Sequence, residues 1–152
     1  CVIGRHDIMN CYGPGEMTST HTGNPVSCAA AHANINYIIK NNIVNRCAEL
    51  EPVVAKRVAA IQEKYPERIG YAKGVGLAWA IIPVIPGTKE PDCEFAHDVV
   101  QIAMEKGVLM FAPVGSGATL KIVPPLIISE QALLEALDVL DEAIALACAR
   151  RK

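Results

Sequence analysis

The residues with the clearest chemical potential lie in the segment 15–25, which reads Gly-Glu-Met-Thr-Ser-Thr-His-Thr-Gly-Asn-Pro. The hydroxyls of Ser19, Thr20 and Thr22 precede an alanine-rich helix that we expect to begin at Pro25, with Asn24 as its N-cap. The first N–H groups of a helix lack intrahelical acceptors, and the helix dipole favours negative charge there. This segment therefore has the residues to bind an anion such as phosphate. The alternative is simple helix capping, a common role of such hydroxyls.

Other residues that could do chemistry have weaker patterns. The segment 115–117 (Gly-Ser-Gly) lacks the continuation of a phosphate-binding loop and is expected to be a turn between strands. The glycines of segment 74–76 suit a tight start to a strand and are not a dinucleotide fingerprint. We expect no metal site, because metal-ligand spacing is missing among the four histidines, His6, His21, His32 and His97.

The composition indicates a folded protein with a mainly aliphatic core. Of the 152 residues, 51% are apolar, 20% are charged and 5% are aromatic, which argues against disorder. The net charge is -2, and basic residues cluster only at positions 150–152. A nucleic-acid or membrane partner is therefore not expected, and the longest apolar runs are too short to span a bilayer.

Six widely spaced cysteines form no C-x-x-C pair, so neither structural zinc nor a redox pair is expected. Cys47 and Cys148 fall on the apolar stripes of expected helices. We therefore expect buried, reduced thiols and a cytoplasmic location.

Apolar residues at spacings of three and four predict four helices. They cover residues 25–40, the stretch from Ile43 to Pro66, residues 95–106 with Gly107 as a C-cap, and a final helix that starts at Ser129. Pro52 either kinks the second helix or marks its first turn. The expected apolar faces consist of Ile43, Cys47, Leu50, Val54, Val58 and Ile61, then Phe95, Val99, Ile102 and Ala103, then Leu133, Leu137, Leu140 and Ile144.

Short apolar runs between turn residues predict strands at residues 69–72, 76–82, 108–112 and 119–123. The run 76–82 is apolar on both faces and is expected to be central. Residues 1–3 are expected to end a buried strand, and residues 5–10 to form a short helical turn. This order predicts an α/β or α+β domain preceded by an appendage.

The string Ser19-Thr20-His21-Thr22-Gly23-Asn24-Pro25 resembles the S-T-x-x-G-N-P segment of class III, pyridoxal-phosphate-dependent aminotransferases, which include the ornithine, acetylornithine and 4-aminobutyrate aminotransferases. Three further segments agree in order. Residues 2–5 (V-I-G-R) resemble the strand after the Schiff-base lysine, and residues 73–77 (K-G-V-G-L) resemble the R/K-G-x-G-L strand of the small domain. Residues 120–126 (L-K-I-V-P-P-L) resemble its I/L-R-x-x-P-P-L. The resemblance covers essentially the whole chain.

The resemblance implies roles for three residues. Thr20 would hydrogen-bond the phosphate of pyridoxal 5'-phosphate held mainly by the other subunit of a homodimer, and Ser19 would add a second contact. Lys121 stands where most relatives carry an arginine that binds the substrate carboxylate through two parallel hydrogen bonds, whereas lysine offers a point charge. This difference keeps a lyase, racemase or decarboxylase of the same family open. The alternative for Lys121 is a strand-end lysine that faces solvent.

The implied fold is the small C-terminal domain of a fold-type I pyridoxal-phosphate-dependent transferase with a trace of the large domain. Residues 1–40 would belong to the large domain, residues 41–66 would form a linking helix, and residues 67–152 would form the small domain. The Schiff-base lysine would lie upstream of Val2, and none of the eight lysines present has the matching context. We therefore expect no catalytic residue here and no activity of the 152 residues alone.

The resulting functional hypothesis is the C-terminal part of an aminotransferase that moves an amino group from an amine or amino acid to a 2-oxo acid. The alternative is a small α/β module that binds a ligand or partner without cofactor chemistry. Such a module would need its first 40 residues to pack on its own core, and their loop-rich, glycine-punctuated sequence argues against that.

Overall fold

The computed structural model describes residues 2–13, 15–16, 18–111 and 117–151. The chain divides into two compact units, Cys1–Asn41 and Asn42–Lys152. Among the described residues, every buried side chain belongs to the second unit. The mixture of helices with an antiparallel sheet is the α+β form of the expected class.

The first unit contains the short helix α1 (His6–Met9) and the longer helix α2 (Pro25–Lys40). Both match the sequence prediction. Apolar side chains of α2 remain exposed, including Val26 at 76% and Ile39 at 71%. A helix with apolar residues on several sides is typical of an element buried in a larger assembly.

The strand expected at residues 1–3 is wrong for the residues described. Val2 and Ile3 have no strand conformation and are 82% and 90% exposed. A strand is defined by hydrogen bonds to a neighbouring strand, and neither residue pairs with a strand in the described part of the chain. Apolar sequence alone therefore did not suffice here.

Three helices in the second unit match their predicted apolar stripes: α3 (Ile43–Lys64), α4 (Cys93–Glu105) and α5 (Glu130–Ala149). The expected faces are buried, except that Cys47 is half-buried and packs against the core. Pro52 lies inside α3, well beyond its first turn. Ser129 caps α5 by accepting the N–H of Ala132 at 3.2 Å.

The sheet has three antiparallel strands, β1 (Ile69–Val75), β2 (Ala78–Pro83) and β3 (Leu120–Ile122), in the order β1-β2-β3. The central position predicted for β2 is confirmed. Gly76 and Leu77 form the turn between β1 and β2, where Gly76 has a φ of +57°. Glycine adopts this conformation without steric cost.

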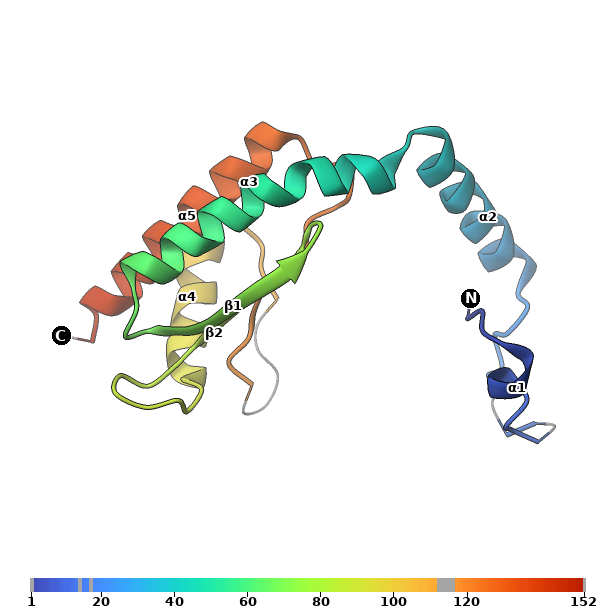
Figure 1. Ribbon diagram of the computed structural model, residues 1–152, viewed down its shortest axis with the longest axis horizontal. Coiled ribbons are helices and arrows are strands. Elements are labelled where there is room, and N and C mark those ends of the chain that lie inside the picture. The colour runs from blue at the N-terminus through green and yellow to red at the C-terminus, as the bar shows by residue number, and fades with distance from the viewer. Residues whose placement is uncertain (1, 14, 17, 112–116, 152) are drawn as a thin grey trace. The chain divides into compact units, whose positions relative to one another are not determined.

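One face of the sheet carries the core. Helix α3 contacts β1, α4 contacts β2, and α5 contacts both helices (Figure 1). Phe95, Ile81 and Leu120 lie in the same apolar cluster as the helix stripes and are fully buried. Burying each such side chain stabilises the fold by about 1.5–3 kcal/mol, so this cluster fixes the position of the sheet.

The strand predicted at residues 108–112 is wrong over residues 108–111, and Ala112 lies outside the described residues. Gly107, with a φ of +91°, ends α4 as predicted. Its N–H donates to Met104 at 3.0 Å, and the N–H of Val108 donates to Ala103 at 2.9 Å. These bonds form a Schellman motif. The N–H of Val108 therefore closes the helix instead of joining a sheet.

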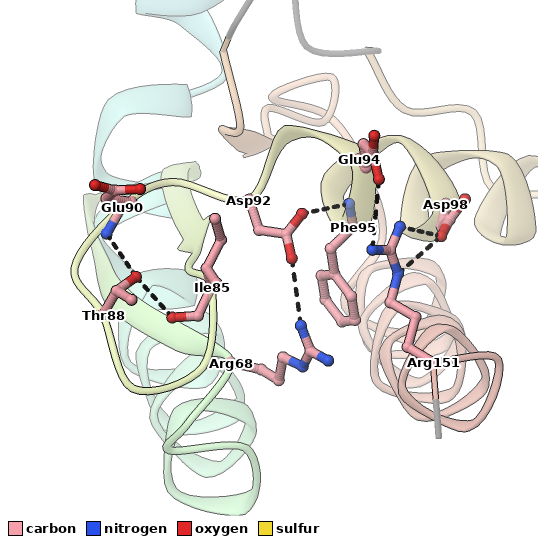
Figure 2. A network of polar contacts seen from close by, with 9 residues as sticks. All are labelled: Arg68, Ile85, Thr88, Glu90, Asp92, Glu94, Phe95, Asp98 and Arg151. Carbon is pink, nitrogen blue, oxygen red and sulfur yellow. Dashed lines mark hydrogen bonds and ion pairs between the residues drawn. The ribbon is translucent and has the colours of Figure 1, made fainter.

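A polar network surrounds the start of α4 (Figure 2). The carboxylate of Asp92 accepts the N–H of Phe95 at 2.9 Å and pairs with Arg68 at 3.3 Å. The guanidinium of Arg68 lies 5.0 Å from the centre of the Phe95 ring, and that of Arg151 lies 5.7 Å from it. Arg151 also pairs with Asp98 at 2.6 Å. The network ties the residue before β1 and the chain just after α5 to the first half of α4.

Candidate functional site

The segment before α2 forms a compact hydroxyl turn. The Oγ of Ser19 lies 2.8 Å from the Oγ1 of Thr22, which also accepts the N–H of Ser19 at 3.2 Å. The N–H of Thr22 returns to the carbonyl of Ser19 at 3.1 Å. Gly23, with a φ of +76°, then directs the chain into α2. These bonds give the segment a defined local conformation.

The start of α2 is already capped. The Oδ1 of Asn24 accepts the N–H groups of Val26 at 3.0 Å and Ser27 at 3.1 Å, and the carbonyl of Asn24 accepts the N–H of Cys28 at 2.9 Å. Pro25 has no N–H to offer. Helix capping, the alternative expected from the sequence, is therefore confirmed, and Asn24 occupies the first N–H groups of α2.

The hydroxyl of Thr20 differs from its neighbours. Thr20 is exposed in this turn and makes no hydrogen bond to another described residue. Ser19 uses its hydroxyl in the contact with Thr22, although a hydroxyl has one donor and two acceptor positions. The O–H of Thr20 is therefore available to donate to a phosphate oxygen. The hydroxyl of Ser19 can contact a phosphate only while it also keeps its contact with Thr22. The residues at this turn fit the phosphate of a cofactor.

Lys121 occupies the middle of β3, where it pairs with Ala80 of β2. Ala80 in turn pairs with Lys73 of β1. Residues opposite one another in a sheet point to the same face, so both lysines flank Ala80 on the face away from the core. Both are exposed and form no ion pair with another described residue. Lys121 can therefore attract a carboxylate.

The glycines of segment 73–77 have a packing role. A Cβ at Gly74 would lie 2.3 Å from the Cγ of Trp79 and 2.4 Å from the carbonyl oxygen of Ala78. The N–H of Gly76 donates to the Oε2 of Glu51 on α3 at 2.7 Å. The tight strand start expected from the sequence is thus part of the hairpin between β1 and β2, in which Gly74 packs against the indole ring of Trp79.

A cavity of about 480 Å³ lies beside β3 and α5, and its wall includes Lys121, Pro124, Ile128 and Ala136. The remaining wall is mostly aliphatic. Among the described residues, no group of three His, Cys, Asp or Glu side chains is placed to hold a metal ion. The expected turn at 115–117 falls partly on residues 115 and 116, which lie outside the described part of the chain.

Two of the displaced pKa values belong to ion pairs that join elements of the second unit. Hydrogen bonding to Asp141 of α5 raises the pKa of Lys64, and hydrogen bonding to Asp98 of α4 raises the pKa of Arg151. Burial raises the pKa of the neighbouring Tyr65. These groups hold helices together, which is a structural role.

Sequence reasoning missed Arg46, whose guanidinium donates to the carbonyl of Leu126 at 2.6 Å and also to that of Ile128. A signal was available. Arg46 falls three residues after Ile43, beside the apolar stripe of α3, where an arginine needs acceptors.

The sequence of the chain is similar to those of known aminotransferases. Residues 1–144 match the family described as aminotransferase class III. The chain is 35% identical over 143 residues to a 4-aminobutyrate aminotransferase of Mycobacterium leprae. This alignment covers 94% of the chain and 32% of that protein. The chain is also 32% identical over 145 residues to an ornithine aminotransferase of Emericella nidulans, in an alignment that covers 95% of the chain and 30% of that protein.

A solved aminotransferase structure is also similar to this chain. The adenosylmethionine-8-amino-7-oxononanoate aminotransferase of Methanocaldococcus jannaschii superposes with a TM-score of 0.73 at 30% identity, over 86% of this chain and 30% of that one. The chain spans about a third of the length of the curated relatives it matches, 32% in the first case. Because the family match runs through nearly all of its residues, the chain belongs to the class III aminotransferases.

Proposed function

We propose that the chain is the C-terminal part of a pyridoxal-phosphate-dependent aminotransferase that moves an amino group from an amine or amino acid to a 2-oxo acid. The observation that carries this proposal is the family match over residues 1–144. The relatives named above are aminotransferases, which favours amino transfer over a lyase, racemase or decarboxylase reaction.

Pyridoxal phosphate supplies, when bound, an electron-withdrawing ring that takes up the electron pair left when the substrate carbon loses a proton. Thr20 holds the cofactor phosphate with its hydroxyl, and Ser19 contributes a weaker contact. The exposure of Thr20 and its unused hydrogen-bonding capacity support this assignment. A hydroxyl hydrogen bond to a dianionic phosphate is charge-assisted and stronger than a neutral one.

Lys121 binds the carboxylate of the substrate. Its ammonium group is a point charge with three rotatable donors, so it attracts a carboxylate without imposing the two parallel hydrogen bonds of an arginine. Its exposed position on the outer face of β3 supports this role. We expect Lys121 to set substrate affinity and to leave cofactor affinity unchanged.

The domain assignment is also a proposal: residues 1–40 in the large domain, 41–66 as a linking helix and 67–152 in the small domain of a cytoplasmic homodimer. Two observations support it. The apolar side chains of α2 have no cover among the described residues of the first unit, as expected if the large domain or a second subunit covers them. The half-buried thiol of Cys47 suits a reducing compartment. No helix in the described ranges is long and apolar enough to cross a membrane.

The test uses the complete enzyme that contains this chain. Thr20→Ala removes one charge-assisted hydrogen bond of about 1.5–3 kcal/mol, so cofactor affinity should fall about 10- to 100-fold in a cofactor titration. Thr18→Ala is the matched control, because Thr18 is also exposed in this segment. An unchanged cofactor affinity in Thr20→Ala would mean that Thr20 does not bind the phosphate and is only part of the turn before α2.

Lys121→Ala should raise the KM for a carboxylated substrate while cofactor affinity stays at the parent value. Lys89→Ala is the matched control, since Lys89 is exposed in the loop after β2. An unchanged KM in Lys121→Ala would mean that the lysine only faces solvent.

A further inference from the structure

We infer that Arg46 is a positioning residue for Lys121. This inference rests on the proposed role of Lys121 in carboxylate binding. Arg46 lies in the first turn of α3. Its two terminal nitrogens donate to two backbone carbonyls in the connection between β3 and α5, Leu126 at 2.6 Å and Ile128. Arg46 therefore contacts two backbone carbonyls that lie 80 and 82 positions further along the chain.

The connection needs such a holder. Residues 123–129 leave β3 and enter α5, and Pro124 and Pro125 carry no N–H for a ladder or turn. Within this connection, the N–H of Ile128 donates to the carbonyl of Pro125 at 2.9 Å. The carbonyls of Leu126 and Ile128 are directed to Arg46 instead. A guanidinium has five donors in a planar fork, so it can hold both at once.

The link to Lys121 follows from the size of its strand. β3 has three residues and pairs with β2 along one edge, through Trp79, Ala80 and Ile81. The carbonyls that Arg46 holds, on Leu126 and Ile128, follow the strand within the same short connection. By holding the chain that leaves β3, Arg46 restrains the open end of the strand, and through it the position of the Lys121 ammonium.

The chain provides a matched control on the same helix. Arg57 of α3 pairs with Asp138 of α5, so it also joins α3 to α5, but it contacts a side chain on the helix and not the connection after β3. A purely structural role of α3 arginines would make the two alanine variants alike. Positioning of Lys121 would make only Arg46→Ala change substrate binding.

The experiment measures steady-state kinetics of the holoenzyme with a 2-oxo acid and with an amino donor that has no carboxylate. A misplacement of about 1 Å can cost up to about 100-fold, so we expect Arg46→Ala to raise the KM of the 2-oxo acid about tenfold. The kcat, the cofactor affinity and the KM of the carboxylate-free donor should stay at parent values, as should all constants of Arg57→Ala. Arg46→Lys should recover part of the loss, because an ammonium can still hold one carbonyl.

A double-mutant cycle with Lys121→Ala completes the test. If Arg46 acts through Lys121, Arg46→Ala should cause no further rise in KM once Lys121 is absent. A further rise of the same size would overturn the inference, as would equal effects of Arg46→Ala and Arg57→Ala. If Lys121→Ala raises the KM and Arg46→Ala does not, the inference fails alone. If Lys121→Ala leaves the KM unchanged, the proposed role of Lys121 fails and this inference fails with it.

Discussion

Replacing Asp92 by alanine should destabilise the second unit more than the loss of a helix cap explains. Asp92 is 8% exposed and has two partners (Figure 2). One carboxylate oxygen accepts the N–H of Phe95 at 2.9 Å, and the other contacts Arg68 at 3.3 Å. The side chain of Arg68 is 19% exposed. The substitution therefore removes an N-cap and leaves a mostly buried guanidinium without its acidic partner.

The two losses can be estimated separately. An N-cap is worth about 1 kcal/mol. Breaking a fully buried ion pair costs about 3–5 kcal/mol, and we take about 2 kcal/mol here because water reaches part of Arg68 and its stacking on Phe95 is kept. The expected loss is about 3 kcal/mol, or about 12 °C in Tm at roughly 4 °C per kcal/mol for a unit of this size.

The assay is thermal unfolding of the 152-residue chain, followed by circular dichroism. Asp92→Asn is the internal comparison, because its amide oxygen can still accept the N–H of Phe95 while the charge is lost. It should lose about half as much stability, about 1.5 kcal/mol. Asp7→Ala should leave the transition in place, since Asp7 is exposed and pairs with the exposed Arg5. A loss in Asp92→Ala of only about 1 kcal/mol, the cap alone, would refute the contribution of Arg68.

Three further predictions concern the hairpin, the alkaline range and the lysines. Gly74→Ala should cost about 1–3 kcal/mol in urea unfolding, because its Cβ would overlap Trp79 and the backbone at Ala78; a neutral result would mean that the indole moves aside freely. Tyr65 has a raised pKa, chiefly through burial, so the folded state keeps its proton longer than the unfolded state. Stability should therefore fall as the pH rises above about 10, the value of an unfolded tyrosine, and Tyr65→Phe should fall less in unfolding measured from pH 9 to 11. Borohydride should not trap pyridoxal phosphate on a single lysine of the 152-residue chain; stoichiometric trapping at one position, seen by peptide mass spectrometry, would contradict the expectation that none of its lysines is the Schiff-base lysine.

The helices of the second unit could be predicted because their signals are local. The stripe of Leu133, Leu137, Leu140 and Ile144 sets the buried face of α5, and Ser129 caps it through a residue three positions away. Gly107 ends α4 because its conformation suits glycine. Each of these features depends on residues within a few turns of one another, so the sequence alone determined them.

The candidate site could be predicted only in part. The hydroxyl turn was found from its residue types and from the family resemblance, and the N-cap expected at Asn24 is confirmed. The sequence could not show that Thr20 is left with an unused hydroxyl. Capping by Asn24 and anion binding compete for the same donors. Only the conformation of the turn decides between them.

Contacts between distant residues were decided by the tertiary structure. Residues 108–111 have the composition of a strand, but the N–H of Val108 closes α4. Arg46 meets carbonyls 80 and 82 positions away, and Asp92 meets Arg68 across 24 positions. The sequence by itself determined which segments are long helices, which side of the helices in the second unit is buried, and which family the motifs indicate. Which donor meets which acceptor depends on how the packed core brings separate segments together, because hydrogen bonds and ion pairs form only at short range.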